Sequence, residues 1–161
     1  KSISKKNRRR RQKNRIAPIL LGLGGLVLVI AALLSLNPGR NGARAAIEVN
    51  GAPSLKVDRE LVDLGDQKNN QPVAVSFKVT NVGDQALRFS EQPYVEVVEG
   101  CCPPLPALGS MVLQPGESTD LSMEFVMHEG MDGMHDFRVH LPTNDPVQPD
   151  RTLTVLSNWG P

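Results

Sequence analysis

Aromatic side chains are scarce in this sequence, which has one Trp, one Tyr and four Phe among its 161 residues. With so few rings, a hydrophobic core has to be built mainly from Val and Leu, which is typical of a small β-domain rather than a large enzyme. The sequence also lacks the CxxC, CxxCH, GxSxG and HExxH motifs. A hydrolase built on Asp132, His135 and Asp136 would rest on two acids beside a histidine, which are usually solvated in a surface loop. We therefore predict that the chain is not an enzyme.

Acidic residues are missing from residues 1–15, which carry nine Lys and Arg. The rest of the chain holds the other nine basic residues and all 17 acids, so its net charge is −8 although the whole chain is +1. A basic run of this kind can bind nucleic acid, but here no aromatic residue is interleaved and an apolar segment follows at once. We predict a cytoplasmic arm that contacts anionic lipid headgroups, and no nucleic-acid partner.

Charge of either sign is absent from residues 16–36, which read IAPILLGLGGLVLVIAALLSL. A helix of this length spans about 30 Å, which matches the hydrocarbon core of a bilayer, and membrane helices tolerate its glycines. A cleaved signal peptide is the main alternative, because residues 43–45 (Ala-Arg-Ala) have the form of a cleavage site. However, the apolar run is longer than the core of a signal peptide and ends several residues before that site. We predict one uncleaved transmembrane α-helix.

The distribution of basic residues predicts the orientation of this helix. Nine precede it, and only Arg40 and Arg44 follow closely, so the positive-inside rule places the N-terminus in the cytoplasm. Residues 37–50, rich in Gly, Asn and Ala, are then a linker. Residues 51–161 form an extracytoplasmic domain, periplasmic or extracellular, on the cell membrane.

From residue 51 the pattern changes to short runs of alternating apolar and polar residues, with turn signals every 8–12 residues. This pattern is typical of a β-sandwich or barrel. No helix signal or internal repeat occurs outside residues 16–36. We expect strands over residues 55–57, 60–64, 73–80, 86–89, 94–98, 110–113, 120–127, 135–141 and 152–156.

Several phrases of the outer domain resemble one family: LVDLGDQ, FKVTNVGDQALRF, LQPGESTDLSMEF and FRVHLPTNDP. They are similar to the bacterial exported immunoglobulin-like domains of unknown function, relatives of the ASH/Hydin-type domains. The resemblance covers about residues 55–158 and implies an all-β, immunoglobulin-like antiparallel β-sandwich with a binding or scaffolding role. Members of the family often carry Cys-Gly-Cys, whereas the two cysteines are adjacent here. The matching residues are Phe77, Asn81, Gly83, Leu87, Cys101, Cys102, Pro115, Gly116, Glu117, Asn144 and Asp145.

The expected strand order brings two loops rich in soft metal ligands to one end of the sandwich. One loop holds both cysteines of the chain, and the other, residues 128–134, is rich in Met and His. Thiolates, thioethers and imidazoles are ligands that suit copper(I), whereas zinc fits the thioethers less well. Met123 is expected in the core, and His140 lies about 17 Å along its strand from His135. The candidate copper(I) ligands are Cys101, Cys102, Met127, His128, Met131, Met134 and His135.

Other interpretations of these residues stay open. The cysteines can be a vicinal disulfide or free structural thiols, and the methionine loop can pack on a partner protein. Two functions follow from the sequence. The first is a non-catalytic accessory subunit of a larger membrane complex, respiratory or photosynthetic, with the lipid bilayer and other membrane-protein subunits as partners. The alternative is copper(I) binding or delivery.

Overall fold

The computed structural model of the chain describes residues 44–161. The predicted basic arm, the predicted transmembrane helix and the first half of the predicted linker lie outside the described residues. Among residues 44–161, no helix is long and apolar enough to cross a membrane. All regular elements of this part are β-strands, so the predicted all-β class is confirmed for the described residues.

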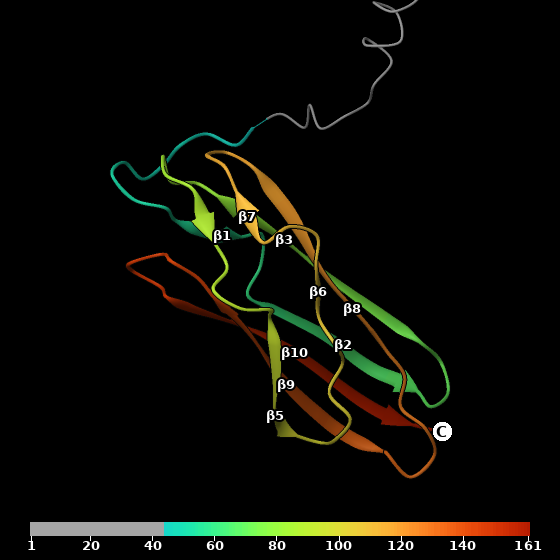
Figure 1. Cartoon of the computed structure of the whole chain (residues 1–161). Helices are drawn as coiled ribbons and strands as arrows, with labels where there is room; N and C mark the ends of the chain where they lie inside the picture. Colours follow the sequence, from blue (N-terminus) through green and yellow to red (C-terminus); the bar gives the residue numbers. More distant parts are fainter. Residues whose placement is uncertain (1–43) are drawn as a thin grey trace, which may run out of the picture. The chain divides into compact units, whose positions relative to one another are not determined.

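The first of two four-stranded sheets has β3 and β8 at its centre (Figure 1). The two strands pair antiparallel over eight residues, from Val73 opposite Phe125 to Thr80 opposite Ser118. The outer strands of this sheet are much shorter. In the order in which they lie, its members are β1 (Leu55–Val57), β3 (Val73–Asn81), β8 (Ser118–Phe125) and β6 (Ala107–Leu108).

The second sheet is built around the two longest strands of the described residues, β9 and β10, which pair antiparallel. In spatial order, its members are β2 (Leu61–Lys68), β10 (Asp150–Gly160), β9 (Gly133–Pro142) and β5 (Tyr94–Glu99). Two short strands, β4 (Leu87–Arg88) and β7 (Val112–Leu113), pair with each other.

One strand pair departs from the predicted antiparallel arrangement. β2 and β10 run parallel, from Leu61 opposite Thr154 to Lys68 opposite Gly160, and every other paired strand is antiparallel within residues 44–161. Parallel neighbours need a long connection, and nearly the whole domain lies between these two strands in the sequence. The prediction of a purely antiparallel sandwich is therefore wrong at this edge.

The core lies between the sheets and follows the period-two pattern of the sequence. Phe77 of β3 and Leu121 of β8 face Phe137 and Val155 of the other sheet, and all four are fully buried. The Phe125 and Phe137 rings meet edge to face with centroids 5.8 Å apart, a favoured aromatic geometry. Met123 is buried among them, as predicted.

Two strands are much longer than the sequence predicts, and one short strand was not predicted. β2 continues to Lys68 and β10 continues to Gly160, although GDQK and SNWG are poor strand sequences. β10 has paired neighbours on both sides, and this pairing extends both strands beyond their local preference. β6 was not predicted, because it is two residues long and follows a stretch rich in proline.

Candidate soft-ligand site

Two loops meet at the end of the domain where β8 stops and β9 starts. The β8–β9 loop, the β2–β3 turn and the C-terminus lie together there (Figure 1). The β5–β6 loop crosses this end with two residues at positive φ, Gly100 at 90° and Cys102 at 55°. A Cβ added at Gly100 would overlap the His135 ring, so only glycine lets the loop lie this close to the imidazole.

The first contact of the site joins Cys101 to His135. The Cys101 Sγ lies 3.9 Å from the His135 Nε2, and His135 is 1% exposed. The other ring nitrogen, Nδ1, is 3.1 Å from the Gly133 carbonyl oxygen. An Nδ1–H that donates to this carbonyl leaves the lone pair of Nε2 facing the thiol, which is the arrangement that prepares a histidine to bind a metal.

The second contact joins Cys102 to Met131. The Cys102 Sγ is 3.8 Å from the Met131 thioether sulfur, and the same sulfur is 3.5 Å from the His128 backbone nitrogen. The Met131 backbone N–H donates to the His128 carbonyl at 3.0 Å, which closes a tight turn. Met131 is thus held at the rim of the core rather than free in solvent.

The two thiols also interact with each other. Both cysteines are free in the structure. The pKa of the Cys101 thiol is raised, first by a hydrogen bond with Cys102, then by desolvation and by the charge of Cys102. Because Cys101 and Cys102 are neighbours in the chain, the two contacts lie side by side at this end of the domain. We call the four residues that make them the sulfur cluster: Cys101, Cys102, Met131 and His135.

Three of the seven predicted ligands lie outside the sulfur cluster. Met127 is fully buried in the core. His128 points toward the β2–β3 turn, where its Nδ1 lies 2.9 Å from the Asn70 side-chain oxygen. Met134 is 47% exposed and lies on the opposite face of β9 from His135, because β9 already begins at Gly133 and neighbouring side chains alternate.

The sequence did not predict two groups that hold the His135 ring in place, Gly100 and the Gly133 carbonyl. A glycine directly before Cys-Cys was a usable signal for close backbone approach, but no sequence pattern marks a single carbonyl as a histidine partner.

Within the part of the chain that the structure describes, no group of three or more His, Cys, Asp or Glu could hold a metal ion. A metal ion at the sulfur cluster would therefore have to use the Met131 thioether.

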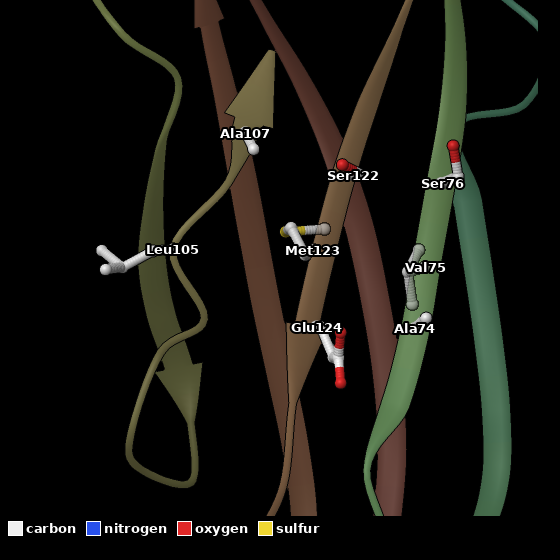
Figure 2. Close-up of a pocket in the computed structure, with 8 residues that line it drawn as sticks. All are labelled: Ala74, Val75, Ser76, Leu105, Ala107, Ser122, Met123 and Glu124. Atoms are coloured by element: carbon white, nitrogen blue, oxygen red, sulfur yellow. The ribbon is translucent and has the colours of Figure 1, made fainter. Parts of the chain in front are cut away.

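A second surface feature lies beside β8, where β6 covers only part of the strand. β6 pairs with Leu121 and Ser122 alone, and an open cleft of about 430 Å³ follows along the strand. Figure 2 shows Leu105 on one side of the cleft, β8 in the middle and β3 on the other side. Leu105 is 89% exposed. The lining residues are Ala74, Val75, Ser76, Leu105, Ala107, Ser122, Met123 and Glu124.

His140 belongs to a separate charged group on the outer face of the second sheet. Its Nδ1 lies 2.8 Å from an Asp150 oxygen and its Nε2 lies 3.2 Å from a Glu96 oxygen. The Tyr94 ring stacks on the imidazole at 4.8 Å. Burial lowers the pKa of His140, but the hydrogen bonds and charges of Asp150 and Glu96 outweigh it and raise the pKa.

Apart from the two cysteines, the polar and glycine residues that carried the family resemblance serve the fold. The fully buried Asn81 side chain accepts hydrogen bonds from the Gly83 and Ser54 backbone and donates to the carbonyls of Gln85 and Leu113. Asp145 accepts from the Leu55, Val147 and Gln148 backbone N–H groups. Gly116, at φ 75°, packs against the chain at Ala45. This opposite end of the domain, called the motif end, consists of Asn81, Gly83, Gly116, Asn144 and Asp145.

Comparison with known proteins finds one family and several distant structures. Residues 53–158 match the family model described as HYDIN/CFA65/VesB-like, Ig-like domain. A Porphyromonas gingivalis W83 protein of unknown function is similar with TM-score 0.52 and 18% identity, over 73% of this chain and 51% of that one. A search of curated proteins found no match.

Two other solved structures are similar with lower scores. Human CEP192 PapD-like domain 7 (an ASH / PapD-like domain) has TM-score 0.49 and 9% identity, over 68% of this chain and 87% of that one. The secreted serine protease VesC from Vibrio cholerae has TM-score 0.48 and 16% identity, over 67% of this chain and 23% of that one. The chain thus spans about half of the Porphyromonas protein and a quarter of VesC, and at these identities the likeness concerns the fold alone.

Proposed function

Because the chain belongs to the HYDIN/CFA65/VesB-like family of immunoglobulin-like domains, we propose that it is a non-catalytic binding module fixed to a membrane. It serves as an accessory subunit of a larger membrane complex, respiratory or photosynthetic. Residues 16–36 cross the bilayer once, and the immunoglobulin-like domain lies outside the cytoplasm.

The observation that carries this proposal is the uncharged run of 21 residues directly after nine basic residues. A run of this length matches a bilayer, and the basic residues before it favour a cytoplasmic N-terminus. With the short linker at residues 37–50, the domain works close to the membrane surface. The partners are the lipid bilayer and the outer parts of other membrane-protein subunits, and nucleic acid has no role.

Exposed apolar side chains on β5 and in the loop after it support a docking role. β5 is an edge strand of its sheet, and Val98 on it is 56% exposed. Leu105 follows in the next loop and is almost fully exposed. Apolar residues grouped on an unpaired sheet edge are a common feature of protein interfaces.

The test is the size of the particle that carries the full chain. Membranes of the source organism are solubilised in a mild detergent and separated by size. The chain is expected to migrate with a particle far larger than its own 17.5 kDa. Val98→Glu with Leu105→Glu should release it, whereas the control Val147→Glu, at a residue 80% exposed elsewhere, should not. A wild-type chain that migrates alone contradicts the accessory role.

Copper(I) binding is the second candidate function. One observation favours it, the contacts of Cys101 with His135 and of Cys102 with Met131 at a single end of the domain. A copper carrier on the outer side of a membrane could deliver the ion to the same complex, so the two functions are compatible.

A further inference from the structure

We propose that the sulfur cluster is a low-coordinate site for a single copper(I) ion. Cys101, His135 and the Met131 thioether hold the ion, and the exposed Cys102 beside Met131 meets it first from solvent. This inference rests on the second candidate function. It reduces the seven ligands expected from the sequence to four and gives each of the four a role.

The distance between the first two donors fits an ion with few ligands. For bonds of about 2.3 Å to sulfur and about 2.0 Å to nitrogen, the 3.9 Å between Cys101 Sγ and His135 Nε2 corresponds to an angle of about 130° at the ion. This angle is wider than the roughly 109° of a tetrahedral zinc site. Soft sulfur and imidazole donors at a wide angle suit copper(I).

The Cys101–His135 pair is fixed before the ion arrives. The His135 ring donates to the Gly133 carbonyl, packs under Gly100 and meets the Phe137 ring at 5.8 Å. The imidazole therefore cannot rotate without disturbing the core. A donor that is already oriented loses little entropy on binding.

The second pair is open to solvent and adjustable. Cys102 is exposed, and Met131 lies between Gly130 and Gly133, both at positive φ. An ion can therefore meet the outer pair first and pass inward to Cys101. Each thiol that binds the ion releases its proton to water, so copper(I) keeps its oxidation state and the bond to hydrogen is replaced by a bond to copper.

The two aspartates that flank His135 in the sequence region of the site are engaged elsewhere, which disfavours zinc and calcium. Asp132 is hydrogen-bonded to Asn69. Asp136 lies on the face of β9 away from His135 and pairs with Arg138 at 2.9 Å. Neither carboxylate is directed to the sulfur cluster, so its donors are three sulfur atoms and one nitrogen.

The experiment is an anaerobic titration of the reduced full chain in detergent with copper(I) against a competing chelator. One ion per chain is expected to bind tighter than micromolar. Cys101→Ser and Met131→Leu should each weaken binding by about 10-fold or more. The matched controls Met134→Leu and His128→Gln replace the same residue types outside the cluster, and they should leave the affinity unchanged.

The outcomes separate this inference from the function it rests on. The controls Met134→Leu and His128→Gln could weaken copper(I) binding as much as the cluster variants do. That result would overturn the four-residue site but would leave copper(I) binding by the chain intact. The same holds if Met131→Leu and Cys101→Ser bind as the wild type does. A wild-type chain that binds no copper(I) tighter than micromolar overturns both the four-residue site and the copper(I)-binding function. That result says nothing about the accessory role.

Discussion

The two ends of the domain satisfy their polar groups in opposite ways. At the motif end, Asn81 makes four side-chain hydrogen bonds to backbone groups, and Asp145 accepts three. At the other end, the thiols and the thioether meet only across contacts near 3.8 Å, and the lone pair of His135 faces sulfur. The first end is complete without a ligand, whereas the second has donors that a soft metal ion would satisfy better.

This difference explains why family membership says little about function here. The phrases that identified the family, NVGD, QPGE and TND, belong to turns at the motif end and specify the fold. The residues with distinctive chemistry, Cys101, Cys102, Met131 and His135, lie at the other end. The comparison therefore predicts that substitutions at the motif end change stability, and that substitutions in the sulfur cluster change binding.

The largest expected effect is at Asn81. Asn81→Ala leaves the carbonyls of Gln85 and Leu113 and the backbone N–H groups of Ser54 and Gly83 without the partner that Asn81 provides, which should lower the free energy of unfolding by about 3 kcal/mol or more. Urea denaturation of the full chain in detergent measures it. Copper(I) affinity under native conditions should stay that of the wild type. A loss below about 1 kcal/mol would mean that the motif end is not the structural support described here.

The next largest effect is expected at Gly100, because a new Cβ there overlaps the His135 ring. Gly100→Ala should lower the free energy of unfolding by about 1–3 kcal/mol. It should also weaken copper(I) binding by about 10-fold or more. Gly130→Ala is its control, since Gly130 has nearly the same φ, 89° against 90°, and open space around its Cα. The two variants share the backbone strain, so the difference between them measures the contact with His135. Equal losses of affinity would contradict that contact.

A smaller effect is expected from His140. Because its pKa is raised in the folded chain, its pairs with Asp150 and Glu96 stabilise the fold fully below its unfolded pKa, about 6.5, and lose this effect as pH rises through the higher folded value. His140→Gln should lower the free energy of unfolding by about 1 kcal/mol or less at pH 5.5, and it should hardly change this free energy at pH 9. Unfolding free energies of both proteins at the two pH values check this. A cost that grows with pH would contradict the sign.

The smallest effect on stability is expected at Cys102. The side chain is exposed and interacts only with Met131 and the neighbouring Cys101, so Cys102→Ser should change the free energy of unfolding by less than about 0.5 kcal/mol. The same variant should lower the rate at which copper(I) is taken up, measured by stopped-flow transfer from a chelator. Unchanged uptake would remove Cys102 from the entry route.

Much of the fold was predictable from the sequence, because it follows from local patterns. Val75, Phe77 and Val79 alternate with polar residues, and this alone fixed a strand and its buried face. The parallel pairing of β2 with β10 was not predictable, since it joins the first long strand to the last and depends on the closure of the whole sheet. The length of β10 has the same cause.

The candidate site was predictable only in part, for a similar reason. Counting strands brought Cys101, Cys102, Met131 and His135 to one end, and the structure places Cys101 against His135 and Cys102 against Met131. The exclusion of Met134 depended on the residue at which β9 begins, and strand ends are the least certain feature of a sequence pattern. The exclusion of His128 depended on Asn70, a partner 58 residues away in the sequence.

The claim that the sulfur cluster is a binding site is tested most directly by X-ray absorption at the copper edge. The full chain, reduced and loaded with one equivalent of copper(I) in detergent, should show two sulfur neighbours at about 2.3 Å and one nitrogen at about 2.0 Å. Met131→Leu should remove one sulfur, and Met134→Leu should leave the spectrum unchanged. A copper shell of nitrogen and oxygen alone would contradict the account.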